Sequence, residues 1–188
     1  PFISIPDREA KPRNQGLTIL LDGGVPKGIF EDIITDHHSF IDFVKFGWGT
    51  SLISETLDDK INILKSNQIE YFFGGTLFEK ALLQNVLDKY YVFLKEKNCT
   101  YVEISNGTIE ISNEEKCKHI KNFSNEFKVF SEVGYKDLGR SLNMHPTEWI
   151  KCINQDKNAG ALKVIAEARE SGKSGICRGD GEIRFGLI

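Results

Sequence analysis

The sequence predicts an α/β fold in which parallel strands alternate with helices. Six short apolar segments, rich in β-branched and aromatic residues, recur along the chain and predict strands. Helix-compatible segments separate them, and successive strand starts are about 23 to 35 residues apart. Polar groups gather where most of the strands end. Such strict alternation is typical of parallel strands joined by crossover helices.

The predicted strands share a short length and most end at glycine or a polar residue. In chain order they are GLTILLD (16–22), FIDFVKFG (40–47), IEYFFGG (69–75), YVEISNG (101–107), FKVFSEVG (127–134) and ALKVIAEAR (161–169). The predicted helices cover 54–67, 77–97, 112–126 and 147–160. The starts of three are marked by Ser54 or Thr56 with Asp59, by Ser112 with Glu115, and by Thr147 after Pro146. Gly160 is expected to end the last helix.

The strand-end residues decide between two architectures. They are Asp22, Lys45, Gly74 to Thr76, Glu103, Ser105, Asn106, Glu132, Glu167 and Arg169. An open doubly wound sheet concentrates its site at one switch point, and no GxGxxG motif follows the first strand. A barrel instead brings every strand end to one mouth. We therefore expect one domain over 1–188 with a (β/α)8 TIM-barrel fold, of which the first six βα units are present.

The length sets a further expectation. A full barrel of this repeat needs about 230–250 residues, so we expect the biological protein to extend about 55–65 residues beyond Ile188. The chain also begins at Pro1 without a methionine, which leads to the same expectation at the other end.

Composition excludes several classes of protein. The net charge of −3 argues against a protein that coats nucleic acid, and no apolar run is long enough for a membrane span. The cysteines, at 99, 117, 152 and 177, form no CxxC pair and are expected to be reduced thiols of a cytoplasmic protein. We expect neither a nucleic-acid nor a membrane partner. His37, His38 and His145 are expected to be exposed.

Side-chain alternation predicts which strand-end groups share a face. Glu103 shares a face with Ser105, and Glu167 shares one with Arg169. Glu132 and Lys45 end their own strands. Because helices cover the outside of a barrel, these charges are expected to point inward and to hold a metal or an anionic substrate. The alternative is that they only pair with one another.

Glycine-rich turns predict anion binding. Segments 45–51 and 74–79 place Thr50, Gly75 and Thr76 just before predicted helices, whose N-termini bind phosphate or sulfonate. Ordinary βα turns are the alternative. Segment 169–175 is not a P-loop, because Glu167 stands where the first glycine is required. It is expected to present Arg169 and Lys173 to an anion. Lys136 follows the fifth strand as an ammonium over the mouth, unless it is simply solvated.

The phrases IDFVKFGWGTS, FFGGTLFEKA, VEISNGT, SEVGYKD and EARESG occur in order between Gly16 and Arg184. They resemble the successive strand-end motifs of the phosphosulfolactate synthase family, in its bacterial branch. The resemblance implies a (β/α)8 barrel and an Mg2+-dependent lyase that adds sulfite to phosphoenolpyruvate to give (2R)-phospho-3-sulfolactate. It implies a step in coenzyme M biosynthesis or sulfolactate formation, and a homo-oligomer, in the archaeal branch a trimer.

Residue roles follow from the same resemblance. It implies that Lys136 is the catalytic general acid. Lys45, Glu103 and Glu132 are further catalytic candidates, and Lys45 is expected to neutralise substrate charge together with Arg169. Glu103 and Glu132 are the first candidates for Mg2+ ligands, and Asp22 and Glu167 are additional ones. Thr50, Gly75, Thr76, Ser105 and Arg169 are expected to bind substrate. Two alternatives stay open: another lyase or isomerase acting on a phosphorylated acid, and a non-catalytic paralogue of the heat-stress-associated type.

Overall fold

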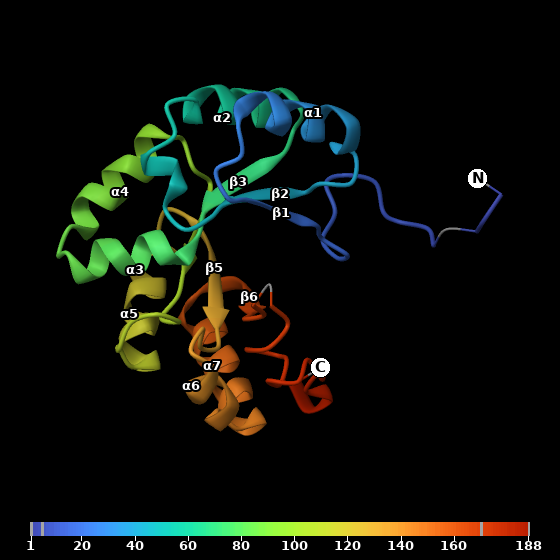
Figure 1. The fold of residues 1–188 in the computed structure, drawn as a ribbon. Coiled ribbons are helices and arrows are strands. Elements are labelled where there is room, and N and C mark those ends of the chain that lie inside the picture. Colours follow the sequence, from blue (N-terminus) through green and yellow to red (C-terminus); the bar gives the residue numbers. More distant parts are fainter. Residues whose placement is uncertain (1, 5, 170, 188) are drawn as a thin grey trace. The chain divides into compact units, whose positions relative to one another are not determined.

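The computed structural model describes residues 2–4, 6–169 and 171–187. Contacts within the chain divide it into two compact units, Pro1–Phe72 and Phe73–Ile188, which are called the first and the second unit below. Helices and strands alternate in both (Figure 1). The predicted α/β class is confirmed, and each of the six predicted strands forms at its expected place.

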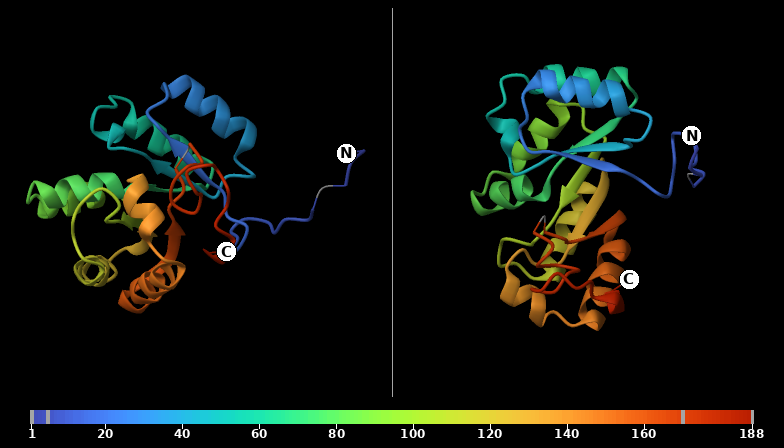
Figure 2. Two further views of the ribbon diagram at one scale, coloured as in Figure 1. Left: turned by 60° about the horizontal axis from the view of Figure 1, so that its bottom comes forward. Right: turned by 45° about the vertical axis from the view of Figure 1, so that its right-hand side comes forward.

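The first unit is a three-stranded sheet with helices packed on it. Its elements are β1 (Ile19–Asp22), α1 (Lys27–His37), β2 (Phe43–Phe46), the 3-10 helix η1 (Thr50–Leu52), α2 (Leu57–Ser66) and β3 (Glu70–Phe73), whose last residue is the first of the second unit. The strand order is β1-β2-β3, and β1 and β2 are parallel. Helix α1 was not predicted. It forms because Phe30 and Ile34, one turn apart, both reach the core. Helices α1 and α2 lie side by side in the right-hand view of Figure 2.

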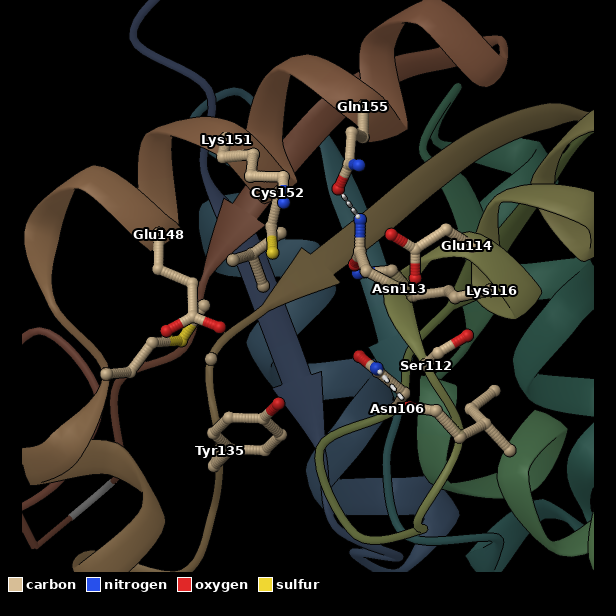
Figure 3. A pocket seen from close by; sticks show the side chains of 14 residues that line it. Asn106, Ser112, Asn113, Glu114, Lys116, Tyr135, Glu148, Lys151, Cys152 and Gln155 are labelled. Carbon is tan, nitrogen blue, oxygen red and sulfur yellow. Dashed lines mark hydrogen bonds between the residues drawn. The ribbon is translucent and has the colours of Figure 1, made fainter.

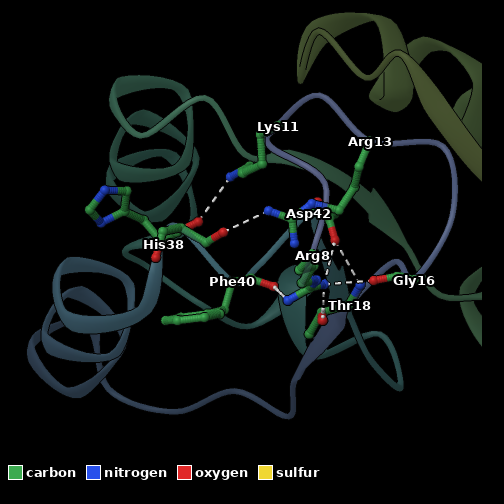
Figure 4. Close-up of polar contacts among 9 residues, drawn as sticks. Arg8, Lys11, Arg13, Gly16, Thr18, His38, Phe40 and Asp42 are labelled. Atoms are coloured by element: carbon green, nitrogen blue, oxygen red, sulfur yellow. Dashed lines mark hydrogen bonds and ion pairs between the residues drawn. The ribbon is translucent and has the colours of Figure 1, made fainter. Parts of the chain in front are cut away.

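An N-terminal segment without helix or strand is fastened to the start of β2 by basic side chains (Figure 4). Asp42 is buried and accepts hydrogen bonds from the Thr18 backbone N–H (2.8 Å) and the Arg8 guanidinium (3.2 Å). Arg13 lies 3.3 Å from its other oxygen. Because Asp42 immediately precedes β2, this network holds the end of the sheet opposite to the strand ends where a site is expected.

The second unit repeats the βα pattern. Its elements are α3 (Gly75–Leu83), α4 (Leu87–Glu96), β4 (Tyr101–Ile104), α5 (Asn113–Phe123), β5 (Lys128–Val133), α6 (Leu138–Asn143), α7 (Pro146–Ala159), β6 (Ala161–Ala166) and the 3-10 helix η2 (Phe185–Leu187). Strands β4, β5 and β6 pair in that order and are parallel. Phe78, Tyr90 and Phe123 pack ring against ring in its core, with centroids 6.1–6.3 Å apart.

Two helix predictions need correction. The single helix expected over 77–97 is two helices, because the chain turns at Asn85, which adopts a left-handed conformation (φ 54°). The capping hydrogen bond expected at the start of α2 is absent, since Thr56 makes no side-chain contact to the helix N–H groups.

The predicted start of α5 and the predicted end of α7 are confirmed, whereas the start of α7 differs from the prediction. Ser112 accepts a hydrogen bond from the Glu115 backbone N–H (3.1 Å), which confirms that cap. Helix α7 begins one residue earlier than expected: Pro146 is its first residue, and the His145 ring, not Thr147, caps it. Gly160 (φ 115°) ends it as predicted.

The strands form two three-stranded sheets, one with β1 to β3 and one with β4 to β6. The structure therefore supports alternating parallel strands and helices, while closure into one barrel stays a prediction. In the described parts of the chain, no helix has the length and apolar character needed to cross a bilayer. His37, His38 and His145 are exposed, as predicted.

Candidate functional site

Lys136 lies three residues after β5 and is held on two sides. Its Nζ donates a hydrogen bond to Thr76 Oγ1 (3.2 Å) and lies 3.5 Å from Glu132 Oε1. Its backbone N–H donates to the Gly107 carbonyl (3.3 Å). Its side chain is only 15% exposed. Simple solvation of this lysine, the alternative left open by the sequence, is wrong.

Two predicted carboxylates lie on one face of the second sheet. Glu103 pairs in register with Phe130, and Glu132 follows Phe130 by two residues, so alternation places both glutamates on the same side. Both are buried. Glu103 Oε1 accepts a hydrogen bond from the Gly75 backbone N–H (2.9 Å). The sequence prediction that strand-end carboxylates and a lysine come together is therefore met within this unit.

Glu79 is a buried carboxylate that the sequence analysis missed. It lies in α3 and has no exposed surface. It accepts hydrogen bonds from the backbone N–H groups of Gly107 and Thr108 (2.9 Å each) and from the hydroxyls of Ser105 and Thr108. The only cue in the sequence was an acidic residue beside Leu77, Phe78 and Ala81 in an otherwise apolar stretch. The group Thr76, Glu79, Glu103, Ser105, Glu132 and Lys136 is called the strand-end cluster below.

The turn at Gly75 brings α3 against the end of β4. A Cβ at this position would overlap the Ser105 hydroxyl and lie 2.9 Å from Glu103 Oε1, so only glycine fits. The first amide of α3 is directed at the Glu103 carboxylate, which is a favourable place for a negative charge. Gly75 and Thr76, which were predicted to precede a helix, are the first two residues of α3. In this structure its groups hold the strand-end cluster: Gly75 holds Glu103 and Thr76 holds Lys136.

Glu167 follows β6 and is buried, whereas Arg169 is exposed. The Glu167 backbone N–H donates to the Val133 carbonyl (2.9 Å), which continues the pairing of β5 with β6. Gly134 (φ 121°) lies against Glu167 and the Trp149 ring. A Cβ at Gly134 would come within 2.8 Å of Glu167 Cβ and 2.5 Å of that ring. Lys173 is exposed as well. The structure therefore brings Glu167, but neither basic side chain of this loop, into the buried end of the sheet.

In the first unit the strand-end charges lie on opposite faces. The register pairs Leu21 with Lys45 and Asp22 with Phe46, so Asp22 and Lys45 point in opposite directions. Asp22 accepts hydrogen bonds from the Gly24 and Val25 N–H groups (2.8 and 3.0 Å). Its other oxygen is 2.6 Å from Lys60 Nζ of α2. The expectation that Asp22 points inward with Lys45 is wrong, because Asp22 faces the helix layer.

The turn 45–51 also differs from the prediction. It leads into the three-residue η1, and α2 begins only at Leu57. The Thr50 hydroxyl donates to the Gly47 carbonyl (2.9 Å) and so stabilises its own turn. Lys45 is half-buried on β2.

A cavity of about 230 Å3 lies beside the Lys136 turn in the second unit (Figure 3). Side chains of α5 and α7 line it, with Asn106 and Tyr135 from the strand-end loops. The charged residues of this lining are Glu114, Glu148, Lys116 and Lys151. This mixture of charges does not select an anion, so the strand-end cluster is the better candidate for the site.

A second buried ion pair lies between α5 and α7 and contacts the backbone of β5. Lys116 Nζ of α5 is 2.8 Å from Asp156 Oδ2 of α7 and donates a hydrogen bond to the Glu132 carbonyl (3.0 Å). Cys117 donates to Asp156 Oδ1 (3.6 Å), and burial together with this carboxylate raises the pKa of the thiol to about 11. All four cysteines are free thiols. These helix-layer contacts fix the backbone at Glu132 without using its side chain.

Within the described residues, no group of three His, Cys, Asp or Glu side chains is placed to hold a metal ion. Mg2+ needs fewer protein ligands than that, since it is commonly bound by one or two carboxylates with water and substrate oxygens. The buried oxygens of Glu103 and Glu132 are donors of the kind that Mg2+ prefers. The donor set therefore fits a magnesium ion that shares its coordination with a substrate.

Comparisons with known proteins agree on one family. The family model described as (2R)-phospho-3-sulfolactate synthase (ComA) matches residues 6–188. The phosphosulfolactate synthase of Bacillus subtilis is 47% identical over 99% of this chain and 74% of its own length. That of Methanothermobacter thermautotrophicus is 39% identical over 95% of this chain and 71% of its own length. The phosphosulfolactate synthase of Methanocaldococcus jannaschii is 40% identical over 90% of this chain and 69% of its own length. This chain belongs to the phosphosulfolactate synthase family.

Proposed function

We propose that the protein is a carbon–sulfur lyase that adds sulfite to phosphoenolpyruvate and forms (2R)-phospho-3-sulfolactate. The observation that carries the proposal is the position of Lys136, a partly buried ammonium held by the Thr76 hydroxyl and the buried Glu132 carboxylate. The names of the similar proteins support the same reaction. Small anionic molecules are accordingly the proposed partners.

The reaction needs a nucleophile, charge stabilisation and one proton. The sulfur lone pair of sulfite forms the C–S bond at C3 of the enol phosphate. The π electrons of the C2–C3 bond move toward the carboxylate, and a proton delivered to C2 completes the addition without breaking the phosphate ester. Lys136 is the proposed general acid, because an ammonium that is fixed near the reacting carbon can deliver that proton to one face.

Glu103 and Glu132 are the proposed ligands of Mg2+, and Glu167 is a further candidate from β6. When bound, the ion stabilises the negative charge that builds up on the substrate carboxylate. Glu132 also lies within ion-pair distance of Lys136, so it helps to fix the position of the lysine ammonium. Asp22 holds Lys60 and two backbone N–H groups instead, and its part in metal binding is tested below.

Binding of the substrate anions is proposed for the remaining predicted residues. Lys45 and Arg169 supply positive charge for phosphate, carboxylate or sulfite. The exposure of Arg169 supports a role in capturing an anion from solvent. The list of proposed polar contacts is completed by Thr50, Gly75, Thr76 and Ser105.

A (β/α)8 barrel is proposed for the fold. Support comes from the parallel pairing in both sheets and from the alternation of strands and helices along the chain. We further propose a homo-oligomer and a cytoplasmic location, and the four free thiols support the location. Sedimentation of the purified protein tests the oligomeric state.

The activity is tested by incubating the protein with phosphoenolpyruvate, sulfite and Mg2+ and following the ultraviolet absorbance of the enol. We expect a loss of absorbance that requires sulfite. Loss that occurs equally without sulfite would replace the proposal by another lyase or isomerase. A folded protein that causes no loss would favour a non-catalytic relative.

A further inference from the structure

We infer that Glu79 is a positioning residue for Lys136, acting through the turn that follows β4. The inference rests on the proposed function for its catalytic meaning, although its structural part can be tested without activity. Glu79 does not touch Lys136 in any contact of the described structure. It acts on the segment Ser105–Thr108, and this segment in turn contacts the lysine.

The first step is the burial and saturation of the Glu79 carboxylate. It accepts hydrogen bonds from two consecutive backbone N–H groups, of Gly107 and Thr108, and from two hydroxyls, of Ser105 and Thr108. Four donors from one short turn converge on a carboxylate without exposed surface. A buried carboxylate with full hydrogen bonding fixes its donors firmly, because leaving any of them unpaired is costly.

The second step leads from the turn to the lysine. The Gly107 carbonyl accepts the hydrogen bond of the Lys136 backbone N–H (3.3 Å). A Cβ on Gly107 would lie 3.6 Å from Lys136 Cε and 3.5 Å from Glu132 Oε1, so the backbone of this turn packs against both side chains. A shift of Gly107 therefore moves the surface on which the Lys136 side chain rests.

The third step is the shared origin of the two supports. Thr76, which accepts the hydrogen bond from Lys136 Nζ, lies in α3 one turn before Glu79. Helix α3 thus supports Lys136 twice. Thr76 contacts its ammonium directly, and Glu79 supports its backbone through the turn at Gly107. Such double support is what a general acid needs, because a displacement of about 1 Å can cost about 100-fold in rate.

The test compares Glu79→Gln with Asp42→Asn. The glutamine keeps the size of the side chain but places an N–H2 group against donors of the turn. Asp42 is a suitable control, because it is also a buried carboxylate. It accepts a hydrogen bond from a backbone N–H and forms ion pairs, and it lies in the first unit before β2. Both variants are made in the full chain. Amide hydrogen exchange is measured by NMR at Gly107, Thr108 and Lys136.

We expect Glu79→Gln to speed exchange at all three amides by at least about tenfold, while Asp42→Asn leaves them unchanged. Faster exchange at Gly107 and Thr108 with unchanged exchange at Lys136 would overturn the inference. In the activity assay, kcat of Glu79→Gln is expected to fall about 10- to 100-fold, with KM for phosphoenolpyruvate within about twofold of the original value. The solvent deuterium isotope effect on kcat should rise, because proton delivery becomes slower. An unchanged kcat in active protein would also overturn it.

A second variant covers the case in which Glu79→Gln does not fold. Thr108→Val keeps the shape of an exposed side chain and removes one hydroxyl donor to Glu79. It is expected to speed exchange at Lys136 by a smaller factor, and unchanged exchange there counts against the inference. If the original chain shows no sulfite-dependent reaction, the proposed function fails, and exchange at Lys136 still decides whether Glu79 holds that residue.

Discussion

Both units of the molecule carry charged residues at strand ends and a buried ion pair in the helix layer, yet they use them differently. In the first unit Asp22 at the end of β1 is itself part of the buried pair, with Lys60. In the second unit the pair is formed between helices, by Lys116 and Asp156. The strand-end carboxylates Glu103 and Glu132 share one face of the sheet, and Glu132 Oε1 lies 3.5 Å from Lys136 Nζ.

The difference shows that a position at a strand end does not decide the role of a charged residue. The decisive property is the face of the strand, which changes with every residue. Asp22 shares its face with the core residue Phe46, and a cation from α2 is therefore needed to compensate it. Glu103 instead shares its face with Glu132 and accepts a hydrogen bond from the Gly75 backbone N–H.

The largest effect is expected for Lys136→Ala. Because this residue is the proposed proton donor, kcat/KM for sulfite addition should fall by at least about 100-fold. The matched control is Lys121→Ala, which removes an exposed lysine of α5 in the same unit. Circular dichroism checks that both variants are folded. Near-normal turnover by Lys136→Ala would show that Lys136 is not the proton donor, and the second unit would then lack the proposed catalytic role.

The next largest effect is expected on the Mg2+ dependence of the rate, which should change for a variant in the second unit but not for one in the first. Glu103→Gln keeps the acceptor for the Gly75 N–H but loses a charge, so the Mg2+ concentration for half-maximal rate should rise at least about tenfold. Asp22→Asn is expected to leave that concentration unchanged in the folded protein. A rise in both variants would show that Asp22 is a ligand after all. Titration of chelator-treated protein with Mg2+ measures both.

The stability of the first unit should depend on its buried pair. Lys60→Met leaves Asp22 without its cation, and the free energy of unfolding should fall by about 3–5 kcal/mol. Lys27→Met is the control, because Lys27 and Asp59 form an exposed pair whose loss should cost at most about 1 kcal/mol. Urea unfolding measures both values. Equal losses would contradict the assignment of Asp22 to the helix layer.

The smallest effect concerns Cys117, which reports on the pair in the second unit. Its thiol pKa of about 11 means that little thiolate is present at pH 8. Alkylation by iodoacetamide should be at least about tenfold slower than in urea-unfolded protein. The folded state holds this proton longer than the unfolded state, so the contribution to stability is lost as pH rises from about 9 toward 11. Equal alkylation rates would show that the Asp156 environment is open.

The sequence by itself determined the six strands, the turns at Gly75 and Gly160, and the candidates Glu103, Glu132 and Lys136. These follow from local patterns: apolar period, glycine where the backbone requires it, and charges just after strands. The family resemblance came from the same strand-end phrases, since residues around a site are fixed by chemistry rather than by packing alone.

Only the tertiary structure decided which charges meet. It placed Asp22 against Lys60, gave Thr76 to Lys136, and showed Glu79 at the centre of the turn after β4. The break at Asn85 was also invisible, because apolar residues continue on both sides of it. The physical reason is common to all of these. A partner that is distant in sequence compensates a buried charge or donor, and no local pattern encodes that partner.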